Sequence, residues 1–236
     1  MEPYVKHYRI LASDVDMHWR LRLSRLFTFL QEAAIAHTEA LGMGREMTLD
    51  RGYLWVVTIQ QAKITRLPSY DEDVVLESLP GKMMHTFFPR HTRLLDADGS
   101  ELVNASALWM LMDEKTRSMV FPEQAGVYIG DGQASWAFWP KSPRLPKGEP
   151  NASFTVPYSY VDLNGHMNNT RYFDLAEDFM PQELRDAAVR EIGTEYTGEA
   201  KLGEDMNLTL WREENQFRVS GSTDKKLFRI SFVYDL

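Results

Sequence analysis

Residues 160–178 read Tyr-Val-Asp-Leu-Asn-Gly-His-Met-Asn-Asn-Thr-Arg-Tyr-Phe-Asp-Leu-Ala-Glu-Asp, and they join a strand-like run (154–158) to a helix-like run that begins near residue 170. Five polar side chains fall within eight positions of this stretch: Asp162, Asn164, His166, Asn168 and Asn169. Backbone N–H groups at the start of a helix point toward a bound anion, and the tetrahedral intermediate of acyl transfer is such an anion. His166 has the side chain that titrates nearest neutral pH, so it could move a proton at this junction.

A capped turn explains the same residues as well as a catalytic site does. Asn164-Gly165 is a strong turn signal, and Asp and Asn side chains accept hydrogen bonds from the free N–H groups of a helix start. The chemistry of the residues alone therefore leaves a catalytic site and a structural turn both open.

The motif Asp162-x-Asn164-x-His166-x-Asn168-Asn169, followed by Tyr172, resembles the active-site signature of the acyl-acyl carrier protein thioesterases. Residues 55–71 are similar to the first long strand of that family, and residues 105–117 are similar to the end of its first half. The chain thus resembles a bacterial-type relative of the plant fatty acyl thioesterases. The resemblance implies an α+β fold, a tandem (double) hot-dog in which each half is an antiparallel sheet wrapped around a central helix.

The composition is that of a folded protein without disulfides. Of the 236 residues, 44% are hydrophobic and 25% are charged, and there is no cysteine. We find no signal-peptide pattern and no apolar run near the roughly 18 residues of a membrane helix, so we expect a cytoplasmic protein. The net charge of −8 argues against a general nucleic-acid binder.

The chain states one pattern of elements twice. Each copy is predicted to hold a short strand, a helix and then four strands. The first copy spans strand 5–11, helix 23–41 and strands 54–66, 74–79, 87–95 and 102–112. The second copy spans strand 154–158, helix 170–179 and strands 189–199, 206–211, 216–220 and 227–234. We therefore predict an N-terminal half at 1–112, a linker at 113–150 that aromatic residues hold to the surface, and a C-terminal half at 151–236.

Three short matches support the duplication. Residues 14–18 (Asp-Val-Asp-Met-His) match residues 162–166 at identical spacing, and residues 25–27 match residues 171–173 after a two-residue shift. Residues 66–71 align with residues 199–204 without a gap, which sets Arg66 opposite Glu199.

The two copies differ where the chemistry would be. The first copy has His18 but lacks the paired asparagines, and it has Arg66 in place of a carboxylate. We therefore predict one active site, in the C-terminal half, and assign the acyl-chain pocket to the N-terminal half, because a fatty tail needs only an apolar tunnel.

The resemblance implies that Asp162, Asn164, His166 and Glu199 are the catalytic residues, without a cofactor or a metal ion. Thioester hydrolysis needs an activated water and a stabilised oxyanion. Either Glu199 or His166 could take the proton of the water, and the sequence does not separate them. We expect Asn164 to orient the water or the carbonyl, and Asp162 to fix Asn164 or the loop.

Backbone N–H groups near Asn168 and Asn169 are the predicted oxyanion donors, with loop support as the alternative role of these residues. Some plant members carry a cysteine directly after the position of Glu199, where this chain has Ala200. Because the chain has no cysteine, a thiolate nucleophile is impossible.

The function predicted from the resemblance is release of free fatty acid from acyl carrier protein. The alternatives are a hot-dog acyl-CoA thioesterase and a non-catalytic acyl-binding module. The expected partner is acyl carrier protein carrying a fatty acyl thioester, with no nucleic acid and no membrane insertion, and with a homodimer left open. Because the carrier is acidic, docking needs a local basic cluster, for which the chain offers Arg20, Arg22 and Arg25, or Lys141, Arg144 and Lys147.

Overall fold

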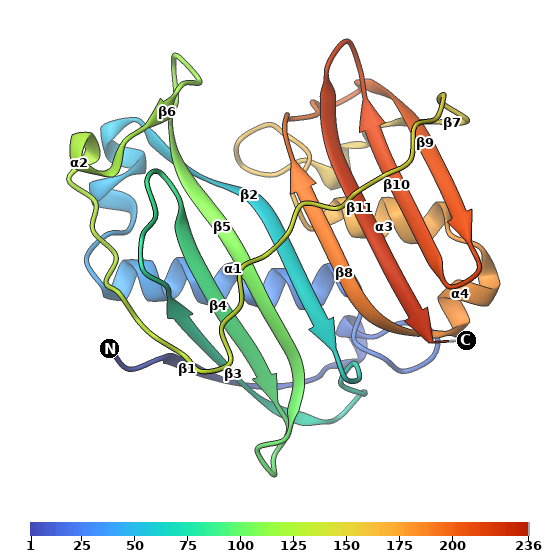
Figure 1. Ribbon diagram of the computed structural model, residues 1–236, viewed down its shortest axis with the longest axis horizontal. Helices are drawn as coiled ribbons and strands as arrows, with labels where there is room; N and C mark the ends of the chain where they lie inside the picture. The colour runs from blue at the N-terminus through green and yellow to red at the C-terminus, as the bar shows by residue number, and fades with distance from the viewer. Residues whose placement is uncertain (236) are drawn as a thin grey trace.

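The computed structural model describes residues 1–235, and Figure 1 shows one long curved sheet with the helices on a single side of it. The first half contains β1 (Tyr4–Arg9), α1 (Leu23–Ala40), β2 (Tyr53–Ile64), β3 (Asp73–Pro80), β4 (Phe88–Leu95), β5 (Glu101–Asp113), β6 (Met119–Val120) and α2 (Pro122–Ala125). The second half contains β7 (Ala152–Thr155), α3 (Arg171–Phe179), α4 (Gln182–Asp186), β8 (Ala188–Tyr196), β9 (Asp205–Glu213), β10 (Gln216–Ser222) and β11 (Lys226–Asp235). Single 3-10 turns lie at Ala12–Asp14, Arg45–Met47, Leu49–Arg51 and Tyr158–Tyr160.

The two halves have the same strand order. The sheet runs β1-β3-β4-β5-β2-β8-β11-β10-β9-β7, with β6 paired to the end of β5. Read outward from the centre, β2-β5-β4-β3-β1 mirrors β8-β11-β10-β9-β7, so each strand has a counterpart at the same place in the other half. The antiparallel β2–β8 pair joins the halves. This arrangement confirms the predicted α+β tandem hot-dog.

The helix of each half packs on one face of its own sheet. Most buried residues of α1 recur every three or four positions, which is the stripe that a helix needs to pack on a sheet: Leu23, Leu26, Phe27, Leu30, Ala33, Ala34 and His37. Gly42, in the left-handed conformation at φ 71°, follows the end of the helix, a position that favours glycine.

The two helices meet at the centre of the molecule. Phe27 of α1 stacks on Phe173 of α3 with ring centroids 3.9 Å apart. These two residues are partners in the sequence match between residues 25–27 and 171–173. Equivalent residues that touch each other lie on the approximate two-fold axis of a duplicated fold, so this contact places that axis between α1 and α3.

The first-half sheet extends into the segment predicted as linker. The boundary predicted at 112 falls one residue before the end of β5, and β6 pairs with β5 through Leu111 and Met112. The sheet extends past the predicted boundary because residues 113–118 form a tight turn, after which β6 runs back alongside β5.

The rest of the segment crosses the outer face of the sheet (Figure 1). Trp136 packs on His91 and under the guanidinium of Arg93, and Lys63 lies over the ring of Phe138. No helix among residues 1–235 is long and apolar enough to cross a membrane.

Candidate active site

The motif turn of the second half is built by the side chain of Asp162. Its Oδ1 accepts a hydrogen bond from the Asn164 N–H at 2.8 Å, and its backbone carbonyl accepts one from the Gly165 N–H at 3.0 Å. Gly165 has φ 77°, a conformation that suits glycine. The Asp162 N–H donates to the His166 carbonyl at 2.9 Å, which closes the turn. Asp162 therefore shapes the loop that presents Asn164 and His166.

Asn168 holds the start of α3. Its side-chain oxygen accepts hydrogen bonds from the N–H of Thr170 at 2.9 Å and from the Thr170 hydroxyl at 2.8 Å. Its own N–H donates to the Tyr160 carbonyl at 2.9 Å and is already engaged there. Within residues 1–235 the Asn169 N–H has no hydrogen-bond partner, and it is the remaining donor of the predicted pair.

Glu199 lies on a loop and not on a strand, which corrects the predicted strand 189–199. The N–H groups of Thr197 and Gly198 both donate to the Leu227 carbonyl, at 2.8 and 3.1 Å, and this doubled contact ends the ladder after Tyr196. The loop is then tied to the motif turn, because the Met167 N–H donates to the Ala200 carbonyl at 2.8 Å. The chain thereby brings Glu199 next to His166.

His166 and Glu199 form the titratable pair of the site. His166 Nε2 lies 3.5 Å from Glu199 Oε2, which is longer than a direct hydrogen bond, and the two side chains are 21% and 37% exposed. The other carboxylate oxygen, Oε1, contacts the guanidinium of Arg117. Arg117 comes from the β5–β6 turn of the first half, and the sequence analysis assigned it no function beyond its place in a segment similar to the family.

Tyr172 of the motif packs beneath the site. It is fully buried and lies against the rings of Tyr196 and Phe228, with centroids 5.5 and 4.6 Å away. Burial raises the pKa of Tyr172 above its ordinary value, so this side chain stays a neutral phenol. Tyr172 therefore supports the loop by packing.

The first half repeats the motif turn, but two residues away from the predicted alignment. The His18 N–H donates to Asp16 Oδ1 at 2.8 Å, as the Asn164 N–H does to Asp162. The Trp19 N–H donates to the Asp16 carbonyl at 3.1 Å, as the Gly165 N–H does to the Asp162 carbonyl. Trp19 also has a positive φ, 66°, like Gly165. His18 is therefore the counterpart of Asn164, and the predicted match of His18 with His166 is wrong.

The same comparison identifies the counterparts of His166 and Glu199 in the first half. The backbone hydrogen bonds that tie each turn to the sheet match: Leu21 to Pro68 and Met167 to Ala200, each 2.8 Å. Arg20 thus takes the place of His166, and Leu67 takes the place of Glu199. The predicted pairing of Arg66 with Glu199 is off by one residue. Arg66 is the second donor of a doubled contact to the Leu102 carbonyl, as Gly198 is in the doubled contact to Leu227, so Arg66 corresponds to Gly198. At these two positions the first half carries neither an imidazole nor a carboxylate.

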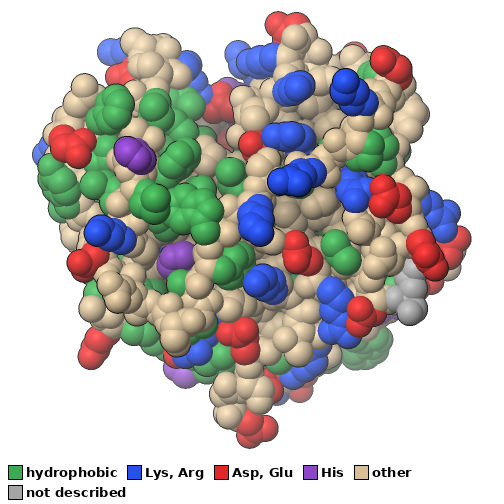
Figure 2. Space-filling view, viewed as in Figure 1, with side chains coloured by type: hydrophobic (Ala, Val, Ile, Leu, Met, Phe, Trp, Pro, Cys, Tyr) green, Lys and Arg blue, Asp and Glu red, His purple; other side chains and the backbone are tan. Residues whose placement is uncertain are grey.

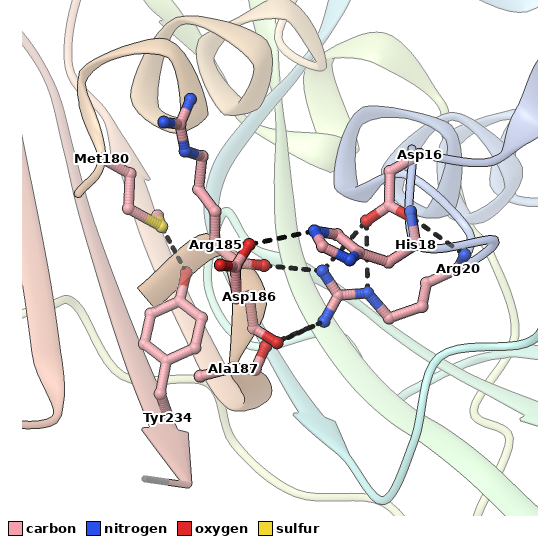
Figure 3. A network of polar contacts seen from close by, with 8 residues as sticks. All are labelled: Asp16, His18, Arg20, Met180, Arg185, Asp186, Ala187 and Tyr234. Carbon is pink, nitrogen blue, oxygen red and sulfur yellow. Dashed lines mark hydrogen bonds and ion pairs between the residues drawn. The ribbon is translucent and has the colours of Figure 1, made fainter. Parts of the chain in front are cut away.

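The turn of the first half contacts the second half instead (Figure 3). The Arg20 guanidinium donates to the backbone carbonyls of Arg185 at 2.6 Å and Ala187 at 2.9 Å, and also pairs with Asp16. His18 Nε2 lies 3.0 Å from Asp186 Oδ1. These contacts fix α4, so the retained polar residues of the first turn act as a link between the halves.

The first half has a small cavity between α1 and its sheet. It measures about 20 Å³ and is lined by Phe27, Leu30, Gln31, Gln60, Gln61, Arg90, Thr92, Ala105, Ser106, Ala107 and Trp109. Polar and apolar residues both line it, and the surface that they expose to the cavity is mostly apolar. Arg90 is buried, and its Nη1 lies 2.9 Å from His37 Nδ1. Burial, aided by the Arg90 charge, lowers the pKa of His37 to about 4, so the imidazole is neutral.

Comparison with known proteins agrees with this architecture. Residues 2–123 match the family model of the acyl-ACP thioesterase N-terminal domain, and residues 146–226 match that of the C-terminal domain. The chain belongs to the acyl-ACP thioesterase family. It is 22% identical over 218 residues to a chloroplastic acyl-[acyl-carrier-protein] hydrolase of Cuphea viscosissima, a match that covers 82% of this chain and 51% of the plant protein. The chain thus spans about half the length of the curated relatives it matches.

Two solved structures show the same fold over nearly the whole chain. An acyl-ACP thioesterase from Bacteroides thetaiotaomicron superposes with a TM-score of 0.88 at 22% identity, covering 98% of this chain and 97% of that one. A putative oleoyl thioesterase from Lactobacillus plantarum superposes with a TM-score of 0.82 at 25% identity, covering 98% and 94%.

Proposed function

We propose that the protein hydrolyses the thioester of fatty acyl-acyl carrier protein and releases free fatty acid. The observation that carries this proposal is the pairing of His166 Nε2 with Glu199 Oε2 at 3.5 Å, beside the start of a helix, in a chain of the acyl-ACP thioesterase family. A base next to helix N–H groups is what acyl transfer to water requires.

The reaction needs only groups that this site can supply. Water attacks the thioester carbonyl carbon and gives up a proton to Glu199 or His166. The oxyanion then collapses, the carbon–sulfur bond breaks, and the carrier thiol leaves with a proton. Asn164, with an exposed side chain on the motif turn, orients the water or the carbonyl, and the free Asn169 N–H is the candidate donor to the oxyanion.

The acyl chain is proposed to lie in the first half, between α1 and the sheet. The small side chains of Ala105 and Ala107 face the cavity there. A volume of about 20 Å³ holds roughly one water molecule, so a fatty chain enters only if side chains such as Gln31 and Gln60 move.

The partner is proposed to be acyl carrier protein in the cytoplasm. Figure 2 shows Lys and Arg side chains gathered along the middle of the face that the linker crosses, although the whole chain carries a net charge of −8. The linker cluster of Lys141, Arg144 and Lys147 suits an acidic carrier better than the cluster around Arg20, because Arg20 and Arg25 are already paired with Asp16 and Asp14.

Hydrolysis of one acyl chain presented on acyl carrier protein and on coenzyme A tests the substrate. We expect kcat/KM to be higher for the carrier-linked chain, since a protein partner adds contacts that coenzyme A lacks. Equal or higher kcat/KM on coenzyme A would favour the acyl-CoA thioesterase. No release from either thioester would favour an acyl-binding module.

A further inference from the structure

The Glu199 carboxylate has one contact on each oxygen. Oε2 faces His166, and Oε1 contacts Nη2 of Arg117. Glu199 directly follows Gly198, the second donor of the doubled contact that ends the β8 ladder. Among residues 1–235 its carboxylate forms no other ion pair and accepts no hydrogen bond. A glutamate on a loop has several rotamers, so a partner that fixes one oxygen also decides where the other points.

The turn that carries Arg117 is well ordered by its own hydrogen bonds. Asp113 Oδ1 accepts bonds from the N–H of Lys115 at 3.0 Å, and from the N–H and hydroxyl of Thr116 at 2.7 and 2.9 Å. The Arg117 N–H donates to the Asp113 carbonyl, and the Asp113 N–H donates to the Ser118 carbonyl, each at 2.9 Å. The bonds from Thr116 hold the pKa of Asp113 below its ordinary value, so this carboxylate stays ionised and keeps the turn closed.

Arg117 occupies a backbone conformation that usually falls to glycine or asparagine. Its φ is 56°, in the left-handed region, where a side chain such as arginine is uncommon. Strained positions of this kind are concentrated at functional sites, where the side chain is needed. The turn itself would form more easily with glycine, so the turn does not explain the arginine.

We infer that Arg117 is a positioning residue, which reaches from the first half to hold the Glu199 carboxylate against His166. The inference rests on the proposed thioester hydrolysis. The planar guanidinium fixes Oε1 and leaves Oε2 directed at the imidazole, where a base is needed. The active site is then built from both halves, although the residues of the family motif all lie in the second.

The test compares kcat and KM of the full chain with those of Arg117→Gly, Arg117→Lys, Glu199→Ala and the double variant Arg117→Gly/Glu199→Ala. Glycine removes the side chain while it relieves the strained φ, so the turn is kept. Lys115→Ala is the matched control, because it removes a positive charge from the same turn without a contact to Glu199. We expect Arg117→Gly to lower kcat by about 10- to 100-fold with little change in KM, the cost of a misplaced catalytic group. Arg117→Lys should recover part of that loss, and Lys115→Ala should keep full activity.

The double variant decides whether Arg117 acts through Glu199. Once Glu199 is absent, removing Arg117 should change kcat by no more than about twofold, because groups that work as a unit are not additive. The inference is overturned by an equal loss in both backgrounds, by a change confined to KM, or by an equal loss in Lys115→Ala.

A readout without catalysis separates this inference from the proposed function. Urea unfolding is measured for the wild type, Arg117→Gly, Glu199→Ala and the double variant Arg117→Gly/Glu199→Ala. It shows whether the changes in the free energy of unfolding of the two single variants add in the double variant. Non-additive losses support the contact between Arg117 and Glu199, even if the chain hydrolyses no thioester. Strict additivity would contradict the contact, whatever the activity.

Discussion

At the scale of single residues, the two histidines of the repeated turns should behave differently. His166 lies beside Glu199, whereas His18 lies beside Asp186 of α4, at the other end of the β2–β8 pair. We expect His166→Ala to lower kcat on an acyl carrier protein substrate by roughly 100-fold or more, the scale for losing a general base. His18→Ala is the matched control and should leave kcat nearly unchanged. Equal losses in steady-state assays of the two variants would contradict the assignment of one site.

The sequence identified the residues of the motif but not all of their relations. The identical spacing of residues 14–18 and 162–166 suggested that His18 repeats His166. The backbone bonds show instead that Arg20 does, because a spacing match of three residues cannot fix a register that hydrogen bonds to a distant strand decide. The role of Arg117 was beyond the sequence for a similar reason: it reaches Glu199 only because the halves fold together.

At the scale of elements, α3 carries a carboxyl that responds to pH. Burial, together with Asp174 and Asp16, raises the pKa of Glu177 from its ordinary value of 4.5 to about 7, against the opposing charges of Arg22 and Arg20. The folded state thus binds a proton that the unfolded state releases between these pH values. The contribution of Glu177 to the free energy of unfolding is fully present below pH 4.5 and is lost as the pH rises through about 7.

Replacing Glu177 should remove that dependence. We expect Glu177→Gln to be more stable than the wild type at pH 8, by up to about 3 kcal/mol, and to differ little from it at pH 4. Urea unfolding across this range measures the difference. Glu183→Gln is the control, because Glu183 is an exposed carboxyl on α4. An unchanged pH dependence in Glu177→Gln would refute this account of α3.

The elements that enclose the cavity give a prediction for specificity. Ala107 on β5 lines the space between α1 and the sheet, so Ala107→Phe should fill it. We expect the preferred acyl chain to become shorter, since each methylene left out of an apolar pocket costs about 0.8 kcal/mol, or about fourfold in kcat/KM. Assays over carrier-linked chains of graded length measure this, with Ala97→Phe on the exposed β4–β5 turn as control. An unchanged preference would place the acyl chain elsewhere.

The elements themselves were mostly predictable. The long strands were predicted close to their observed bounds, and the helix α1 to within a residue. The end of β8 was predicted three residues too late, because the doubled contact to Leu227 is a tertiary event. The five-residue helix α4 is too short for a periodic signal, and it was missed.

At the scale of the whole molecule, the contact between Phe27 and Phe173 should hold the halves together. Both rings are fully buried and stack at the approximate two-fold axis. We expect Phe27→Ala and Phe173→Ala each to lower the free energy of unfolding by about 3–5 kcal/mol. In the double variant the loss should fall short of the sum by about 1 kcal/mol, the energy of a stacked pair.

A pair of phenylalanines without a shared contact provides the control. The two residues are Phe27 and Phe217, since Phe217 packs on Phe232 within the second half. The double variant Phe27→Ala/Phe217→Ala should therefore lose the sum of the two single losses of unfolding free energy. Denaturant unfolding measures all of these variants. Full additivity for Phe27 and Phe173 would mean that the observed stack does not stabilise the joined halves.

The central claim concerns the whole molecule as well: two copies of one fold, of which only the second performs chemistry, through Glu199 and His166. The most direct measurement is the turnover of Glu199→Ala on fatty acyl-acyl carrier protein, beside the wild type. We expect free fatty acid to be released by the wild type, and kcat to fall by roughly 100-fold or more in the variant, with its fold intact. Near-normal turnover in Glu199→Ala would contradict the account and leave His166 as the only base.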